Sequence, residues 1–204
     1  MITIIDYGLG NIKAFQNIYN QLNLDCVVAR DADTLRNASK IILPGVGSFD
    51  FAMLSLNKSG MRETLDELVL TKKIPILGIC VGMQMLANSS EEGSLDGLGY
   101  VGGSVKRFSK EQLVNYPLPH MGWNAVKQEG VKDHLFNNIP NAERFYFLHS
   151  YYFDCAQELQ KIALAEYGVK FTCGVRNNNI YGIQFHPEKS HLAGISLLAN
   201  FGKM

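Results

Sequence analysis

Short apolar runs alternate with amphipathic stretches over residues 1–90. Strands are expected at 1–5, 24–29, 40–43 and 74–79, the last of which is apolar at almost every position, as in a strand covered on both faces. Apolar side chains recur at helical spacing at 12–22, weakly at 32–37, at 51–56 after a cap at Ser48, and at 61–69 after a break at Gly60. This alternation predicts an α/β fold built on a doubly wound, mostly parallel sheet.

Glycine and proline punctuate the chain from Gly93 onwards, where antiparallel hairpins are expected rather than further β-α units. Strands are expected at 145–152, 162–165, 171–176 and 180–185, with an Asn turn at 177–179 and a closing helix at 195–201. The sequence has no repeat, no low-complexity tract and no linker long enough to divide it. We therefore expect one domain over residues 1–204, a mixed sheet with an antiparallel insertion.

The charge balance argues against partners that are recognised by a long-range field, because 19 Lys and Arg residues are matched by 19 Asp and Glu residues. Binding to nucleic acid or to an anionic membrane surface is therefore not expected. The apolar stretches fall far short of the roughly 20 residues that cross a bilayer, and the N-terminus lacks the basic flank of a signal peptide. These features predict a cytoplasmic protein.

The four cysteines are Cys26, Cys80, Cys155 and Cys173. They stand far apart, without a C-x-x-C pair and without a histidine at metal-ligand spacing. We expect free thiols, and the pattern indicates no disulfide framework, no metal and no cofactor.

Residues 76–84 read I-L-G-I-C-V-G-M-Q, a strand that ends at a cysteine between two glycines and leads into an expected helix. This is the spacing of a nucleophile elbow, with Cys80 in the place of serine. Side chains at Gly78 and Gly82 would collide with the flanking strand and helix. A helix N-terminus after Cys80 would favour the thiolate and offer backbone N–H groups to an oxyanion. The alternative is a buried cysteine beside two packing glycines.

His186 ends the apolar strand expected at 180–185, and Pro187 and Glu188 then turn the chain off the sheet. A cysteine nucleophile needs a base, and the base needs an acceptor that orients it. Residues two apart in extended backbone face the same side, so Glu188 can reach back to the imidazole. Cys80 and His186 both fall at the carboxyl ends of strands, where open α/β sheets place their sites. The alternative is a strand-end histidine beside a solvated glutamate.

The segment L-P-G-V-G-S at 43–48 also follows a buried strand, and it contains no titratable side chain. Its glycine-rich backbone suits an oxyanion hole. A phosphate loop is the competing interpretation, but the Lys-Ser/Thr ending of a Walker motif is missing. Residues 6–11, D-Y-G-L-G-N, resemble part of a dinucleotide fingerprint, but Lys13 stands at the third glycine position, so a tight turn is the better interpretation.

L-G-I-C-V-G-M-Q at 77–84 together with F-H-P-E at 185–188 resembles the class I (triad) glutamine amidotransferases, in which Cys, His and Glu release ammonia from glutamine. Within that class, four further motifs look like the glutaminase subunits of imidazole glycerol phosphate synthase: D-Y-G-L-G-N at 6–11, P-G-V-G at 44–47, P-H-M-G-W-N at 119–124 and L-H-S-Y at 148–151. The resemblance runs from about residue 3 to the C-terminus. It implies a flavodoxin-like amidotransferase fold.

The resemblance also implies roles for individual residues. Cys80 would be the nucleophile, His186 the general base and acid, and Glu188 the residue that orients His186. The backbone amides of Val81 and of Val46 or Gly47 would form the oxyanion hole. Gln84, Ser150 and Tyr151 would help to hold glutamine. Tyr146, Lys189, His120 and Trp123 would belong to the partner interface and the path of ammonia.

The same resemblance implies that ammonia is passed to a second protein. Free ammonia at neutral pH is mostly unreactive ammonium, so a useful glutaminase must deliver ammonia directly to an acceptor site. One domain takes up nearly the whole chain, and the acceptor site is therefore expected in a partner. In the family this partner is a (β/α)8-barrel cyclase, which makes imidazole glycerol phosphate and AICAR in histidine biosynthesis.

Two stretches differ from many members of the family, I-K-A-F at 12–15 and S-F-D-F at 48–51. Both resemble a paralogous branch that supplies ammonia to a sugar amidotransferase in surface-polysaccharide synthesis, and this branch is the alternative to the histidine pathway. Two other functions are a scaffold without turnover and a free-standing cysteine hydrolase of γ-glutamyl compounds. The intact Cys, His and Glu set argues against the scaffold, and P-H-M-G-W-N is not explained by the hydrolase.

Overall fold

The computed structural model describes residues 1–109, 111, 113–130 and 133–204. Its strands are β1 (Ile2–Ile5), β2 (Cys26–Ala29), β3 (Lys40–Gly45), β4 (Ile76–Cys80), β5 (Ser89–Ser90), β6 (Gly103–Arg107), β7 (His120–Gln128), β8 (Glu143–His149), β9 (Tyr151–Cys155), β10 (Lys161–Tyr167), β11 (Val169–Asn177) and β12 (Ile180–Ile183). Its helices are α1 (Ile12–Gln21), α2 (Ala32–Leu35), α3 (Phe49–Lys58), α4 (Arg62–Asp66), α5 (Val81–Gln84) and α6 (His191–Lys203). A π-helical turn (Glu67–Thr71) continues α4, and 3₁₀ turns lie at His134–Phe136, Glu158–Gln160 and Pro187–Lys189.

The strands form one mixed sheet in the order β2-β1-β3-β4-β12-β11-β10-β7-β8. The first five of these run parallel, and all later neighbours in this order are antiparallel. β9 branches from β11 and continues the sheet to β6. The parallel half has the 2-1-3-4-5 order of flavodoxin-like folds, with β12 as the fifth strand. The predicted α/β fold with an antiparallel insertion is therefore confirmed.

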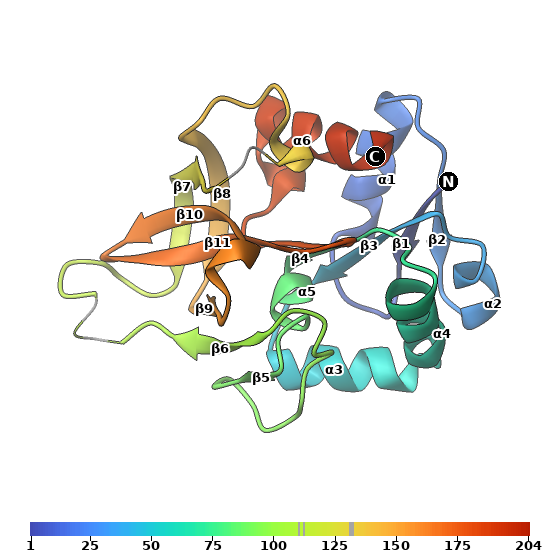
Figure 1. Ribbon diagram of the computed structural model, residues 1–204, viewed down its shortest axis with the longest axis horizontal. Coiled ribbons are helices and arrows are strands. Elements are labelled where there is room, and N and C mark those ends of the chain that lie inside the picture. Colours follow the sequence, from blue (N-terminus) through green and yellow to red (C-terminus); the bar gives the residue numbers. More distant parts are fainter. Residues whose placement is uncertain (110, 112, 131–132) are drawn as a thin grey trace.

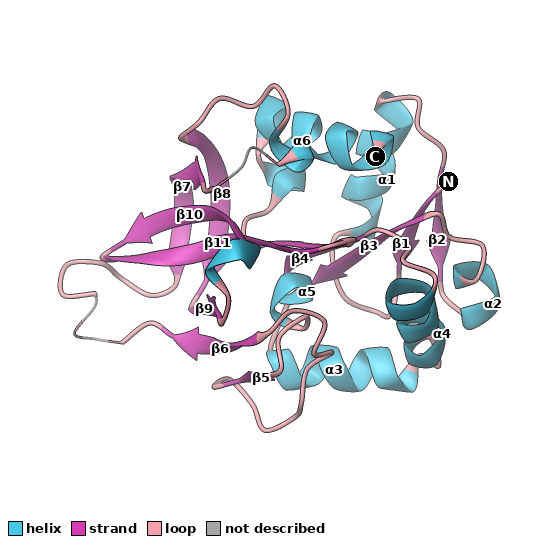
Figure 2. Cartoon of the chain, viewed as in Figure 1, coloured by secondary structure: helices cyan, strands magenta, loops and turns pink. Residues whose placement is uncertain are grey.

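Helices cover both faces of the parallel half (Figure 1): α1 and α6 lie on one face, and α3 and α4 on the other. The antiparallel strands extend to the other side of the molecule, where few helices cover them (Figure 2). Strands β1, β4 and β12 are buried throughout, as at Leu77, which is fully inaccessible, whereas the edge strand β2 is partly buried. This explains why the sequence of β4 is apolar without alternation.

Local contacts shift three of the expected elements. Ser48 stands at the N-cap of α3, but its side chain makes no capping hydrogen bond, and the Glu92 carboxylate accepts the Phe49 N–H instead, at 2.8 Å. The strand expected at 145–152 is two strands, because the chain changes partner at Ser150: β8 pairs with β7, and β9 pairs with β6. The helix expected after Cys80 spans only four residues.

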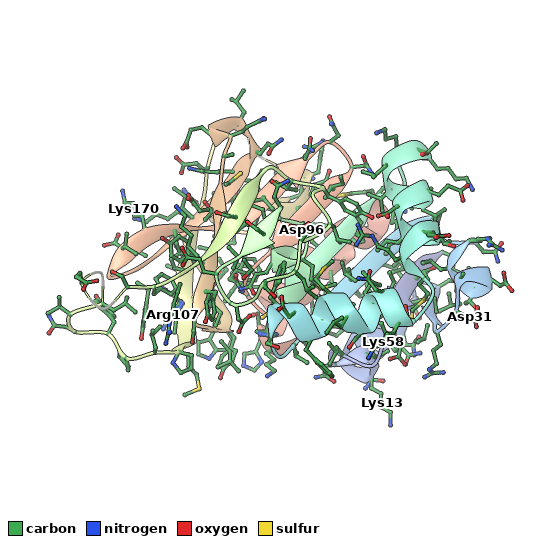
Figure 3. All side chains as sticks on the ribbon, turned by 90° about the horizontal axis from the view of Figure 1, so that it is seen from below. Lys13, Asp31, Lys58, Asp96, Arg107 and Lys170 are labelled. Carbon is green, nitrogen blue, oxygen red and sulfur yellow. The ribbon has the colours of Figure 1, made fainter. Side chains whose placement is uncertain are left out.

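Charged side chains of both signs are spread around the surface. Lys13, Lys58, Lys170, Arg107, Asp31 and Asp96 are exposed and lie on different parts of the chain (Figure 3). No helix in the described part of the chain combines the length and the apolar character needed to span a membrane.

Candidate active site

Cys80 lies at a sharp turn between a central strand and a helix. It is the last residue of β4 and the N-cap of α5, with φ of 56° and ψ of −114°. Residues other than glycine rarely adopt such a backbone, so this turn is strained. The residue is only 4% exposed. This is the geometry of a nucleophile elbow, which the G-x-C-x-G spacing predicts.

Three glycines allow the strands and the helix to approach one another around Cys80. A Cβ added at Gly82 would lie 2.0 Å from the Leu43 carbonyl oxygen, and one added at Gly78 would lie 2.6 Å from the Gly82 carbonyl oxygen. A Cβ at Gly45 would lie 2.4 Å from the Gly82 nitrogen. All three contacts are with backbone atoms, so no side-chain rotation could relieve them. The elbow therefore requires glycine at each position.

His186 reaches the same place from the neighbouring strand. β12 lies beside β4, and its continuation is held by the His186 N–H, which donates to the Tyr146 carbonyl at 2.8 Å. The His186 Nδ1 atom lies 3.0 Å from Glu188 Oε1, and both side chains are at most 5% exposed. Glu188 reaches the imidazole from the 3₁₀ turn Pro187–Lys189 rather than from the extended backbone that we expected.

The environment of His186 favours its protonated form. Burial by itself lowers the pKa of this imidazole, but its interactions with the Cys80 sulfur and with the Glu188 carboxylate outweigh burial and raise the pKa. Since Nδ1 faces Glu188, the other ring nitrogen is left for chemistry. This Nε2 atom is buried, and no described residue offers it a hydrogen bond of standard geometry.

A cavity of about 300 Å³ opens at this turn. The structure brings nine of the sequence-predicted site residues to its wall: Val46, Gly47, Cys80, Val81, Gln84, Ser150, Tyr151, His186 and Lys189. Gln84 is nevertheless buried, and its amide donates to the Tyr151 carbonyl at 3.1 Å and to Gln184 Oε1 at 3.0 Å. Its side chain thus already has partners within the protein.

The turn at residues 6–11 supports the glycine-rich segment at the cavity wall. The buried Tyr7 hydroxyl donates to the Pro44 carbonyl at 2.7 Å, and burial raises the Tyr7 pKa, which keeps this donor protonated. Beyond Pro44, Val46 is exposed and Gly47 has a positive φ of 87°. The amides at 46 and 47 therefore lie in a segment that is fixed at one end and exposed at the other.

Three of the four residues assigned to the partner interface are neighbours, and the fourth is buried. Lys189 Nζ is 5.7 Å from the centre of the Tyr146 ring, and the Trp123 and Tyr146 rings are 6.2 Å apart, so these three are neighbours. His120 is 2% exposed and hydrogen-bonds to His149 inside the protein. His120 is thus not exposed on the surface to which Trp123 contributes.

An apolar face extends from the cavity along β7 and β8. Trp123 pairs with Tyr146, and Met121 pairs with Leu148, which also lines the cavity. Met121, Trp123 and Leu148 are 64%, 38% and 36% exposed. Large apolar side chains that gather on a surface mark an interaction site.

Glu92 is a site residue that the sequence reasoning missed. Among the described residues of the cavity wall it is the one with a carboxylate, and burial raises its pKa. Its sequence signal, an acidic pair before Gly93, gives no indication that the side chain folds back to the start of α3. Gln184 and His149 were also missed, and both hydrogen-bond to residues of the site.

Two buried histidines form a line that begins at the cavity wall with His149 and continues inward to His120. His149 Nδ1 lies 2.7 Å from the Tyr151 carbonyl, His149 Nε2 lies 2.9 Å from His120 Nδ1, and His120 Nε2 lies 3.2 Å from the Asn124 amide nitrogen. A carbonyl can only accept and an amide nitrogen can only donate. Both histidines must therefore be neutral for every one of these hydrogen bonds to form.

This arrangement predicts a loss of stability in mild acid. Burial lowers the pKa of His120 to about 4 and that of His149 to about 3, whereas a histidine in the unfolded chain titrates near about 6.5. Above that pH the two histidines are neutral in both the folded and the unfolded protein. Below it they bind protons in the unfolded chain but stay neutral in the folded protein. The free energy of unfolding should fall by up to about 1.4 kcal/mol per pH unit for each histidine between pH 6.5 and 5. Urea unfolding at a series of pH values measures this slope.

The variant His120→Gln is the control, because it keeps an N–H donor for His149 and removes one titrating group. We expect it to reduce the slope by about half. An unchanged slope would contradict the assignment of the acid sensitivity to these two histidines.

Known proteins are similar to this chain over nearly its whole length. The model of the family "Glutamine amidotransferase class-I" matches residues 3–203. The chain is 57% identical over 205 residues to the imidazole glycerol phosphate synthase subunit HisH of Bdellovibrio bacteriovorus, and 50% identical over 206 residues to that of Leptospira interrogans, with 100% of each chain covered in both cases.

Solved structures with low sequence identity share the fold. A crystal structure of a glutamine amidotransferase superposes with a TM-score of 0.74 at 16% identity, covering 100% of this chain and 99% of that one. The glutaminase domain of Trypanosoma brucei CTPS with bound acivicin gives a TM-score of 0.66 at 15% identity, covering 99% and 93%.

Proposed function

This chain belongs to the class I glutamine amidotransferases. From its 57% and 50% identity to two HisH subunits, we propose that it is the glutaminase subunit of an imidazole glycerol phosphate synthase in histidine biosynthesis. It hydrolyses glutamine to glutamate and passes the ammonia to a synthase partner. One observation carries the proposal at the level of chemistry: Cys80, in a strained elbow, lines the same cavity as the imidazole of the buried His186–Glu188 pair.

The first half-reaction forms a thioester on Cys80. The Cys80 thiol gives its proton to His186 Nε2, as the raised His186 pKa favours, and the resulting thiolate attacks the side-chain carboxamide carbon of glutamine. The oxygen of the tetrahedral intermediate is negatively charged, and it accepts from the amide of Val81 and from that of Val46 or Gly47. His186 then gives its proton to the nitrogen, the C–N bond breaks, and ammonia leaves.

The second half-reaction returns the enzyme to its starting state. A water molecule gives a proton to His186 Nε2 and attacks the thioester carbon, and the C–S bond breaks to release glutamate. Glu188 stays on Nδ1 throughout and stabilises the imidazolium that forms in each half-reaction. The raised pKa of His186 agrees with this role, because it keeps a proton ready for the leaving nitrogen.

Glu92 gives the cavity a group that can bind the α-ammonium of glutamine, alongside Gln84 and the Ser150–Tyr151 backbone. Glu92→Gln should raise KM for glutamine about tenfold or more while kcat changes little, since a charged hydrogen bond far from the reacting carbon is lost. In the Glu92→Gln variant, the new side chain keeps an oxygen that can accept the Phe49 N–H, so α3 remains capped. Steady-state kinetics of glutamate release measure KM and kcat. An unchanged KM would contradict the role of Glu92 in binding the α-ammonium group.

The exposed face of β7 and β8 suits the partner. It is continuous with the cavity at Leu148 and carries Trp123 next to Tyr146 and Lys189, which we assign to the interface and the path of ammonia. The partner is a (β/α)8-barrel cyclase that uses ammonia to make imidazole glycerol phosphate and AICAR. The proposal includes that the protein acts in the cytoplasm.

Reconstitution with the cyclase tests the function. We expect glutamate release to rise when the cyclase and its substrate are added, and imidazole glycerol phosphate to form with glutamine as the nitrogen source. Stimulation by a sugar amidotransferase and not by the cyclase would move the protein to surface-polysaccharide synthesis. Equal turnover without any partner would indicate a free-standing hydrolase.

A further inference from the structure

A single backbone carbonyl sets the direction of a hydrogen-bond network beneath the active site. The Tyr151 carbonyl accepts from His149 Nδ1 at 2.7 Å on one side and from Gln84 Nε2 at 3.1 Å on the other. Because this oxygen has no proton to give, Gln84 must turn its NH₂ group toward it. The orientation of the Gln84 amide is thereby fixed.

The same argument fixes the next amide along the network. The NH₂ group of Gln84 also faces Gln184, at 3.0 Å, and Gln184 must therefore present its oxygen there. The nitrogen of Gln184 is left on the opposite side of its amide, where it lies 3.8 Å from the Cys80 sulfur. The chain of donors thus ends with an N–H that points at the nucleophile.

The position of Gln184 in the sequence suits this contact. It is the first residue after β12, and it stands two residues before His186 in the bend through which the chain leaves the strand. Both residues therefore directly follow the strand that pairs with β4, whose last residue is Cys80. The intervening Phe185 is fully buried against Phe145, with ring centres 4.2 Å apart. His186 approaches Cys80 from the cavity wall, whereas Gln184 is fully buried and does not line the cavity.

We propose that Gln184 is a further catalytic residue, which donates its amide N–H to the Cys80 sulfur from the protein interior and stabilises negative charge there. This inference rests on the proposed glutaminase function. Negative charge gathers on the sulfur twice: when the thiol gives its proton to His186, and when the C–S bond of the thioester breaks and the electron pair returns to sulfur. A buried donor acts at both points, and no substrate atom competes for it because Gln184 lies outside the cavity.

A neutral amide at this point also has an advantage over a charged group. A buried cation would hold the thiolate too strongly and would need its own counter-ion, whereas an amide adds no net charge to the site. The partial positive charge of the N–H is aimed by the Tyr151 carbonyl through Gln84, so it does not have to reorient during the reaction. The network therefore holds the donor in place before glutamine binds.

Two variants of Gln184 and one matched control test this inference. Gln184→Met keeps the length of the side chain and removes the N–H. Gln184→Glu keeps the shape and places a carboxylate oxygen beside the sulfur. Gln160→Met makes the first replacement at a partly buried glutamine in the turn Glu158–Gln160, far along the chain from the site.

Two rates are measured for each folded variant. The first is alkylation of Cys80 by iodoacetamide at pH 7.5 in the chain alone, resolved by peptide mass spectrometry with Cys26 as the internal reference. The second is steady-state glutamine hydrolysis in the complex with the cyclase. For Gln184→Met we expect both the alkylation rate and kcat to fall about tenfold, the effect of one hydrogen bond to a charged atom, with KM within about twofold of the wild type. In Gln184→Glu both rates should fall further, and in Gln160→Met both should equal those of the wild type.

Alkylation and kcat that stay within about twofold of the wild type in both variants would overturn the proposal, as would a change confined to KM. If Gln184→Met does not fold, the nearly isosteric Gln184→Glu decides the outcome. Alkylation requires neither glutamine nor a partner. A wild type that reacts with iodoacetamide but never hydrolyses glutamine would therefore refute the glutaminase function and leave the role of Gln184 to be judged on alkylation.

Discussion

Hydrolysis of glutamine by the cyclase-bound protein is expected to fall by at least about a thousandfold when Cys80 is replaced by alanine. The sulfur is the atom that forms the thioester, and no described neighbour in the cavity wall offers another thiol or a hydroxyl on an elbow. Water activated by His186 alone lacks the covalent step that divides the reaction into two lower barriers. Glutamate release under saturating glutamine measures the loss.

Two controls make that result specific. Cys26→Ala removes a thiol that lies outside the cavity and should leave the rate unchanged. Synthesis of imidazole glycerol phosphate from added ammonium should persist in the Cys80→Ala complex, because the partner still receives its nitrogen. Retention of glutamine hydrolysis by Cys80→Ala would overturn the proposed mechanism.

The second large effect is on folding, at Gly82. A Cβ at this position would lie 2.0 Å from the Leu43 carbonyl oxygen and 3.0 Å from its carbon, both of them backbone atoms of β3. Gly82→Ala can be accommodated only if α5 and β3 move apart, so we expect a loss of at least about 3 kcal/mol in the free energy of unfolding, or failure to fold. The intrinsic preference of a helix for alanine over glycine, about 1 kcal/mol, acts in the opposite direction. A net loss of stability can therefore be attributed to the clash.

Gly102→Ala is the matched comparison. The nearest heavy atom to an added Cβ there is the Ala156 Cβ at 3.9 Å, an ordinary van der Waals contact. We expect a change within about 0.5 kcal/mol in urea unfolding. Equal effects of the two substitutions would contradict the steric account of the elbow.

Periodicity and glycine placement predicted the part of the molecule where local pattern and tertiary structure agree. The apolar runs of β1, β3 and β4 are strands covered on both faces, and α1 buries Phe15, Ile18 and Tyr19 along one stripe, as its spacing predicts. The elbow at Cys80 followed from two glycines whose reason is steric and short-range. Proximity of His186 followed from its place at a strand end.

Contacts between distant segments account for what the sequence did not predict. Glu92 caps α3 across 43 residues, and nothing near Ser48 indicates that its own side chain is not used. The bend at Ser150 arises because β8 and β9 pair with different strands, although the residues themselves read as one strand. The direction of the Gln184 amide depends on a carbonyl in another strand, which no local pattern specifies.

The backbone of Cys80 sets activity and stability against each other at a single residue. Its positive φ costs about 1–3 kcal/mol for a residue with a Cβ, and glycine would relieve most of that strain. The protein is thus less stable because a cysteine stands where the fold would accept glycine more readily. A screen for heat resistance alone would select against the nucleophile, so any stabilised form of this protein has to gain its stability elsewhere.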